Sequence, residues 1–395
     1  MTKVLRGILS VLALVTVTAL AAASTPSSAI TVDCSKGQSL NQTLAKLDKH
    51  TPTTVSVNGT CTEYVQVVGF ENLTLKGLSG ATVVQPSTSS GSLLNAVLYI
   101  QSSRSVMVSG LNVQADATSP AEGIGIGHGS SDIRLRYLTV TGGGEGISVF
   151  ENSQVSIAYV NGQAPGYATL GIYDSSDVHV EHSQFTGATG AAWNVGIALG
   201  ASHVTLYATT ITNMQVSIGA YQSSIVDVVT FDTYYSTGGS TDVTIQNPAG
   251  TNYNGVQVDG GGSLNLESAR LVINKAGQTW GGTTGGVLLS DGATMSATNG
   301  NLIINGSNSQ GVMALNNAHA TLTGATVTSG GHGGLVAANL SSIDLSAGSS
   351  PSIIGGNSVD LFCDSTSWIT GSANIAGKPT AQCTNLLTTE TVTLP

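Results

Sequence analysis

The sequence predicts an all-β fold: a single-stranded, right-handed parallel β-helix, in which three sheets run along one solenoid. The first observation is that a glycine followed by an apolar residue recurs at roughly 25-residue intervals, a period typical of repeat architectures. The second is that short alternating strands and polar turns follow each recurrence. The third is that the interval varies, whereas a left-handed hexapeptide helix would keep a constant period. The repeated glycines are Gly123, Gly146, Gly171, Gly196, Gly255, Gly286, Gly311 and Gly334.

The strands are predicted from apolar residues two apart, which share one face of a strand. Pairs such as Ile124/Ile126 and Ile147/Val149 would therefore point inward. Neighbouring coils would lie about 4.8 Å apart, so that their side chains form a continuous core. We expect one internal file from Ile124, Ile147, Ile172 and Ile197.

The composition agrees with a folded solenoid. Hydrophobic residues make up 41% and charged residues 9% of the chain, which argues against disorder. Twelve basic and 22 acidic residues give a net charge of −10, so we expect no nucleic-acid partner. Anionic lipid surfaces would repel the chain, and we expect no membrane insertion once the signal is removed.

Residues 1–29 are predicted to be a secretory signal peptide, because Lys3 and Arg6 precede an apolar run and then small residues. Cleavage after Ala23 or after Ala29 fits this segment. Residues 30–60 would form an N-terminal cap with a short helix, for which Ser39 is a possible N-cap. The β-helix is assigned to 61–362, and a C-terminal cap and tail to 363–395.

The four cysteines fall into two local pairs, Cys34 with Cys61 and Cys363 with Cys383. In a secreted chain these predict two disulfides, one near each end of the solenoid. A shared metal site is the rival interpretation, but cysteines from opposite ends cannot meet. We therefore assign no metal and no cofactor, and expect a secreted or cell-surface protein.

The Gly-apolar strand starts and turns such as Ser175-Ser176-Asp177-Val178 resemble those of right-handed parallel β-helix proteins of the pectin-lyase-like superfamily. The resemblance spans about residues 50–375. It implies the fold and a substrate lying along the first sheet. That superfamily includes polysaccharide lyases, hydrolases, esterases, tailspikes and non-enzymatic surface proteins, so the fold leaves the activity open.

The expected outward positions of the first sheet hold no carboxylate or base, which argues against a pectate-lyase-type calcium and arginine site. These positions are Gly125, Ser148, Tyr173, Ala198, Gly219, Gln257, Leu288 and Met313.

The candidate catalytic residues are four. Glu122 and Glu145 occupy equivalent places on successive coils, and the pair would share a proton or a cation, or splay into solvent. With His128 and Asp174 they could support acid–base cleavage of a sugar bond. The alternative is a set of solvated turn residues.

On the next sheet Arg134 and Arg136 are expected to point outward, where surface ion pairs are the usual outcome.

Aromatic residues gather in the return segments just before the Gly-apolar strands. Their rings could line one side of the solenoid and stack on sugars, or they could pack the loops onto the core. The predicted carbohydrate-binding residues are Tyr167, Tyr173, Trp193, Tyr234, Tyr235, Tyr253 and Trp280.

The leading functional hypothesis is a secreted protein that binds an extended polysaccharide or cell-surface glycan through these aromatics. The first alternative is a polysaccharide lyase or glycoside hydrolase that uses Glu122, Glu145, Asp174 and His128. The second is a non-catalytic structural or adhesive surface protein.

Overall fold

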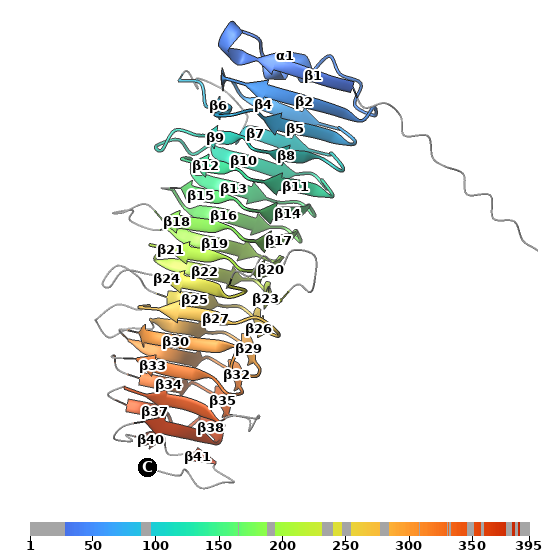
Figure 1. Cartoon of the computed structure of the whole chain (residues 1–395). Coiled ribbons are helices and arrows are strands. Elements are labelled where there is room, and N and C mark those ends of the chain that lie inside the picture. The colour runs from blue at the N-terminus through green and yellow to red at the C-terminus, as the bar shows by residue number, and fades with distance from the viewer. Residues whose placement is uncertain are drawn as a thin grey trace, which may run out of the picture.

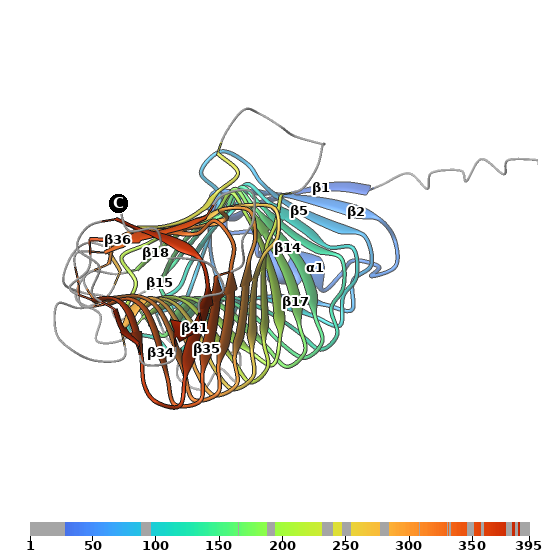
Figure 2. The same cartoon turned by 90° about the horizontal axis from the view of Figure 1, so that it is seen from below.

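The computed structural model describes residues 28–87, 96–164, 166–187, 194–230, 240–246, 254–276, 284–307, 309–329, 331, 333–345, 351–356, 359–376, 381–383 and 386–387. It confirms the right-handed parallel β-helix (Figure 1). Three parallel sheets of 15, 13 and 13 strands run along one rod. Viewed from below in Figure 2, the strands of successive coils lie one behind another around a common interior.

The strands follow one another in threes, one to each sheet. The 15-stranded sheet contains β1 (Ser28–Asp33), β2 (Thr53–Asn58), β5 (Leu73–Gly77), β8 (Met107–Ser109), β11 (Ile133–Arg136), β14 (Gln154–Ala158), β17 (Asp177–Glu181), β20 (His203–Tyr207), β23 (Ile225–Val228), β26 (Ser263–Leu266), β29 (Thr294–Ala297), β32 (His319–Leu322), β35 (Ser342–Leu345), β38 (Trp368–Gly371) and β41 (Leu386–Leu387).

The first 13-stranded sheet carries the candidate site and is called the site sheet below. It contains β4 (Val65–Val68), β7 (Ala96–Gln101), β10 (Glu122–Gly127), β13 (Glu145–Val149), β16 (Ala168–Tyr173), β19 (Val195–Gly200), β22 (Val216–Tyr221), β25 (Asn254–Val258), β28 (Gly285–Leu289), β31 (Gln310–Leu315), β34 (Gly333–Ala338), β37 (Val359–Cys363) and β40 (Ala381–Cys383).

The second 13-stranded sheet closes each coil. It contains β3 (Thr60–Thr62), β6 (Thr82–Val84), β9 (Asn112–Gln114), β12 (Thr139–Thr141), β15 (Asn161–Ala164), β18 (Gln184–Gly187), β21 (Thr210–Thr212), β24 (Val243–Gln246), β27 (Leu271–Asn274), β30 (Leu302–Ser307), β33 (Thr326–Ser329), β36 (Ser352–Gly355) and β39 (Ala373–Ala376).

The predicted internal file needs one correction, in the third coil. Ile124 lies opposite Ile147 as expected, but Ile147 lies opposite Leu170, which in turn lies opposite Ile197. Ile172 is fully buried one place further along, opposite Val149. A slip of two residues keeps every side chain on its own face, so alternation alone could not detect it.

A file of buried serines follows the corner between the site sheet and the 15-stranded sheet. Three successive backbone amides, those of Ser153, Ser176 and Ser202, donate to the hydroxyl of the serine one coil on, at 3.1–3.2 Å. Most hydroxyls in turn donate to a carbonyl of their own turn, as Ser153 does to Phe150 at 2.8 Å. The file satisfies backbone groups that the sharp bend buries. Its members are Ser103, Ser130, Ser153, Ser176, Ser202 and Ser224.

The N-terminal cap contains the predicted helix, α1 (Leu40–Leu44), with Ser39 at its N-cap. The Ser39 hydroxyl accepts from the amide of Gln42 and donates to Glu63. The Glu63 carboxylate also accepts from the first two helical amides, at 2.7 and 3.2 Å. A carboxylate at this end complements both the unpaired amides and the helix dipole.

Both predicted disulfides are confirmed. Cys34, in the turn η1 (Cys34–Lys36), joins Cys61 in β3 with a Cα separation of 5.1 Å. Cys363 joins Cys383 on the neighbouring strand of the site sheet, at 4.4 Å. In the chain-entropy model each loop closure stabilises the fold by about 3 kcal/mol. Among the described residues no helix is long and apolar enough to cross a membrane.

The structure bears on the cleavage position of the predicted signal, most of which lies outside the described residues. Strand β1 already begins at Ser28, which pairs with Thr53, and the ladder continues to Asp33. Cleavage after Ala29 would remove two paired residues, whereas cleavage after Ala23 would spare the strand. We therefore expect cleavage of the predicted signal to leave a chain that begins at Ser24. Mass spectrometry of the intact processed chain checks this, and a start at Ile30 would contradict it.

Candidate active site

The outer face of the site sheet carries two carboxylates on adjacent strands. Because Ile124 pairs with Ile147, Glu122 on β10 and Glu145 on β13 stand at the same position of successive coils. On the flanking strands, Ala96 is in register with Glu122 and Ala168 is in register with Glu145. The pair is thus flanked by small apolar side chains.

A break in alternation turns Glu122 to the outer face. Simple alternation would put Glu122 on the same side as Ile124, which is inside. Instead, the next residue, Gly123, faces the interior: a Cβ there would lie 2.7 Å from Cγ1 of Val140. Glu122 lies over Gly125, where a Cβ would come within 2.6 Å of its Oε2. A side chain at 123 would also meet the Gly146 carbonyl oxygen at 2.5 Å, and one at 125 would displace the Glu122 carboxylate from this position.

The two carboxylates differ in their surroundings. Burial and the Glu145 charge raise the pKa of Glu122 to about 8, against an opposing hydrogen bond from Ser148. Burial also raises the pKa of Glu145, but hydrogen bonds from Tyr173 and Ser148 favour its charged form. The Tyr173 hydroxyl donates to Glu145 Oε1 at 2.7 Å. Glu122 is therefore the member that keeps its proton at neutral pH.

One oxygen of each carboxylate is unsatisfied. Oε2 of Glu122 and Oε2 of Glu145 are buried and have no hydrogen-bond partner in the described part of the chain. Buried polar atoms are normally paired, and an unpaired one calls for an explanation such as a catalytic role or a bound water or ion. The pair thus has two acceptor positions left for a substrate group or a shared proton.

Tyrosine rings lie beside the pair and, with Tyr221 on β22, further along the same face. Tyr173 lies back over Gly171, where a Cβ would come within 2.6 Å of its ring, and this position lets the hydroxyl reach Glu145. Tyr221 lies over Gly219 in the same way, and burial followed by the nearby Tyr167 and Asp259 raises its pKa to about 12. The Gly-x-Tyr spacing in both strands is the sequence signal that could have revealed Tyr221.

Tyr99 on β7 lies beside Glu122 on the N-terminal side of the pair. Its ring stacks on Phe150 with centroids 6.3 Å apart, and a Cβ at Gly125 would meet it at 3.0 Å. Burial, then Glu151 and Glu122, raises its pKa. The sequence analysis did not single out Tyr99, because its place depends on the glycines of the next coil.

The predicted set of four catalytic residues is divided. His128 and Asp174 lie past the other end of the strands, with Glu151, all with left-handed backbone (φ 55–56°). His128 forms an ion pair with Glu151. Strand β10 is six residues long, so the Cα atoms of Glu122 and His128 are about 20 Å apart along it. The structure brings Glu122 and Glu145 together and puts His128 and Asp174 beyond the other end of the strands, where the His128 ring packs edge-on against Tyr99 with centroids 6.3 Å apart.

The predicted aromatic residues are only partly described. Tyr167 is 43% exposed; its amide donates to Gly144 at 2.6 Å and its carbonyl accepts from Val195, which fixes the ring beside Glu145. Burial and the Glu145 charge raise its pKa. Tyr173 belongs to the outward file of Phe150 and Gly200, and Gly171 takes the place expected for it beside Ser148. Trp193, Tyr234, Tyr235, Tyr253 and Trp280 lie outside the described residues.

One cluster has the composition of a metal site. Cys34, Cys61 and Glu63 lie within 4.8 Å of one another in the described part of the chain. The two sulfurs are joined in a disulfide and Glu63 caps α1, so these residues have structural partners already.

Comparisons with known proteins support no assignment by family. No protein-family model and no curated protein matches the sequence. The chain is similar in structure to a tailspike of Acinetobacter phage vb_AbaP_AS12, with 12% identity and a TM-score of 0.47; the match covers 88% of this chain and 63% of the tailspike, less than two thirds of its length.

Two enzyme structures are also similar. A pectin methylesterase in complex with a hexasaccharide shows 13% identity and a TM-score of 0.31, covering 68% of this chain and 81% of that chain. The catalytic domain of a GH87 alpha-1,3-glucanase in complex with tetrasaccharides shows 12% identity and a TM-score of 0.33, covering 93% and 69%. Function must therefore be argued from this chain's own residues.

Proposed function

We propose that the protein binds an extended polysaccharide across the outer face of the site sheet and cleaves a glycosidic bond there. One observation carries the proposal: two partly buried carboxylates stand on adjacent coils, one with its pKa raised to about 8 and the other hydrogen-bonded by a tyrosine. Environments that separate two carboxylates in this way are typical of an acid–base pair.

The roles follow from the surroundings. Glu122 is the general acid, because burial keeps it protonated, and its proton goes to the glycosidic oxygen as the bond to the anomeric carbon breaks. Glu145, held by Tyr173 and Ser148, is the nucleophile that takes the anomeric carbon. Water, deprotonated by Glu122, then releases the sugar. Adjacent strands lie about 4.8 Å apart, which fits the short carboxylate spacing of a retaining enzyme.

Tyr167 and Tyr173 are the proposed binding surface beside the pair. Tyr167 offers an exposed ring, and a tyrosine combines an apolar face for the sugar with a polar hydroxyl. The apolar file Ala168, Val195 and Val216 continues from Glu145 along the next coils, but these side chains are buried and do not belong to the binding surface. The two disulfides support an oxidising, extracellular setting for such a substrate.

A polysaccharide panel tests the proposal, with assays for retention of the protein, for new reducing ends and for unsaturated ends. We expect reducing ends without unsaturation, and a loss of at least about 100-fold in Glu145→Gln. The matched control is Glu267→Gln, which removes one exposed negative charge directly after β26 on the 15-stranded sheet and should retain activity. Retention without any release would leave a binding protein and refute cleavage; unsaturated ends would identify a lyase.

A further inference from the structure

Three cations of this acidic chain gather on the outer face of the 15-stranded sheet, away from the glutamate pair. Lys76 on β5, and Arg134 and Arg136 on β11, all point outward there. Arg134 is paired, with its Nε and Nη2 at 2.9 and 2.8 Å from Oδ1 of Asp132. Lys76 and Arg136 form no ion pair with any described residue.

The two unpaired cations lie on either side of a serine. Lys76 is in register with Ser109, and Ser109 with Arg136, on three successive strands. Lys76 and Arg136 are therefore about 9–10 Å apart at the backbone, with only a small hydroxyl side chain between them. Nε of Arg136 is buried and without a hydrogen-bond partner among the described residues. The arrangement offers an ammonium, a hydroxyl and a guanidinium around one gap, a donor set suited to a carboxylate or sulfate.

An exposed aromatic face adjoins this gap. Tyr137, directly after Arg136, is 61% exposed and stacks on Tyr159 with centroids 4.9 Å apart and an angle of 10°. The stack continues to His182 at 5.0 Å, so the rings follow the spacing of the coils. The corner below Tyr137 is Gly110, where a Cβ would meet only the Gly77 carbonyl oxygen, at 3.2 Å. The outer face of the Tyr137 ring is therefore uncovered. Beside it, over Gly110, the surface has an open step that could hold a sugar ring.

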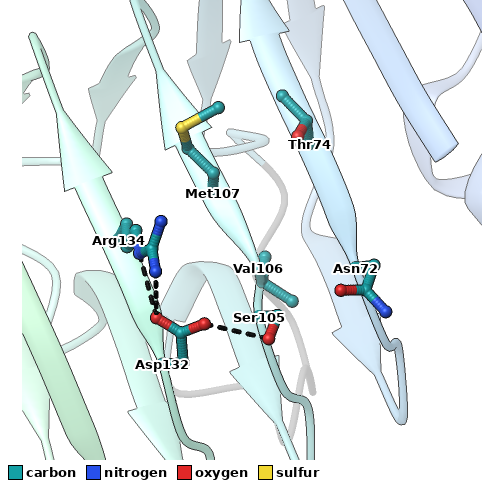
Figure 3. A pocket seen from close by; sticks show the side chains of 7 residues that line it. All are labelled: Asn72, Thr74, Ser105, Val106, Met107, Asp132 and Arg134. Carbon is teal, nitrogen blue, oxygen red and sulfur yellow. Dashed lines mark hydrogen bonds and ion pairs between the residues drawn. The ribbon is translucent and has the colours of Figure 1, made fainter. Parts of the chain in front are cut away.

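A shallow pocket of about 330 Å³ opens on the same three strands, two residues earlier. Figure 3 shows Thr74, Met107 and Arg134 side by side from β5, β8 and β11, with Asp132 linked to both Arg134 and Ser105. The pocket extends the surface beyond the space that a single sugar would occupy.

We propose that this surface is a second saccharide site, specific for a sugar that carries a carboxylate or a sulfate. The sugar ring stacks on the free face of Tyr137 in the step above Gly110. Its anionic group lies between Lys76 and Arg136 and accepts from the Ser109 hydroxyl. The site tethers an acidic polymer to a chain whose overall charge of −10 would otherwise repel it. It does not depend on the glutamate pair, which lies on another sheet.

Binding of dextran sulfate, of polygalacturonate and of neutral dextran, measured by isothermal titration calorimetry at 50 mM and 300 mM salt, tests the site. We expect at least one of the two acidic polymers to bind, more weakly at high salt, and dextran not to bind. The polymer that binds identifies the anionic group. Lys76→Gln and Tyr137→Ala should each weaken binding at least about fivefold. Both side chains are exposed, so the variants should fold.

Lys275→Gln is the matched control, because it removes one exposed positive charge directly after β27 of another sheet, and it should bind as the wild type does. Glu145→Gln should also retain binding, which separates this site from the proposed active site. Equal binding of dextran, failure of both acidic polymers, or an equal loss in Lys275→Gln would overturn the proposal.

Discussion

A Glu122→Gln variant is expected to melt at a higher temperature than the wild type at pH 8 and at the same temperature near pH 4. The pKa of Glu122 rises from 4.5 to about 8 on folding. A carboxyl with a raised pKa favours the folded state fully below pH 4.5, and that contribution is lost as the pH rises toward 8. Glutamine resembles the protonated acid and escapes this penalty, which is roughly 2–4 kcal/mol at pH 8.

Thermal unfolding of the wild type and the variant between pH 4 and pH 8 measures the effect. The same variant should lose cleavage, since glutamine has no proton to give. Glu267→Gln serves as the control for simple removal of an exposed negative charge. A wild-type protein whose stability, relative to Glu122→Gln, does not fall between pH 5 and pH 8 would show that Glu122 ionises normally, and the assignment of the general acid would fail with it.

Phe185→Ala is expected to cost about 3–5 kcal/mol of unfolding free energy. Phe185 is the largest fully buried side chain among the described residues, and it lies opposite Gly162 on the neighbouring strand. A Cβ at Gly162 would come within 2.9 Å of its ring, so the phenyl group fills space from two coils. Removing the ring leaves a cavity that the stacked backbone cannot close.

Denaturant unfolding measures the total loss, and hydrogen exchange shows where the solenoid opens. Because each coil contacts only its neighbours, protection should fall first in β15, β18 and β21. Phe185→Leu keeps most of the volume and should cost less than half as much. A loss below about 1 kcal/mol in Phe185→Ala would mean that the coils relax into the space.

The sequence predicted the fold well because alternation and the coil period are properties of the backbone geometry. Glu122 and Glu145 were paired correctly for the same reason, since equal positions in equal coils become neighbours. The third coil was assigned two residues late because Gly171-Ile172 imitates the repeat. The true equivalent of Gly123 and Gly146 is Thr169, which lies between the partners of Glu145 and Ile147 on the neighbouring strand.

The candidate site was harder to predict than the fold. His128 and Asp174 were expected at the far edge of the strands that carry Glu122 and Glu145 and were grouped with the pair, although a strand separates its ends by its full length. The outward turn of Glu122 depends on Gly123 facing the interior, which no periodic pattern reveals. Tyr99 lies against Gly125 of the next coil and Tyr221 lies back over Gly219 of its own strand, and these contacts belong to the folded state alone.

The serine file has a consequence for what the rod can accommodate. At the corner it occupies, the site sheet passes to the 15-stranded sheet through only two to five residues in every coil. At the opposite entrance to the site sheet the connection ranges from two residues, between β30 and β31, to eleven, between β6 and β7. A foreign peptide grafted at that entrance would leave the serine file intact. The rod can therefore serve as a display scaffold whose inserts all emerge beside the site sheet.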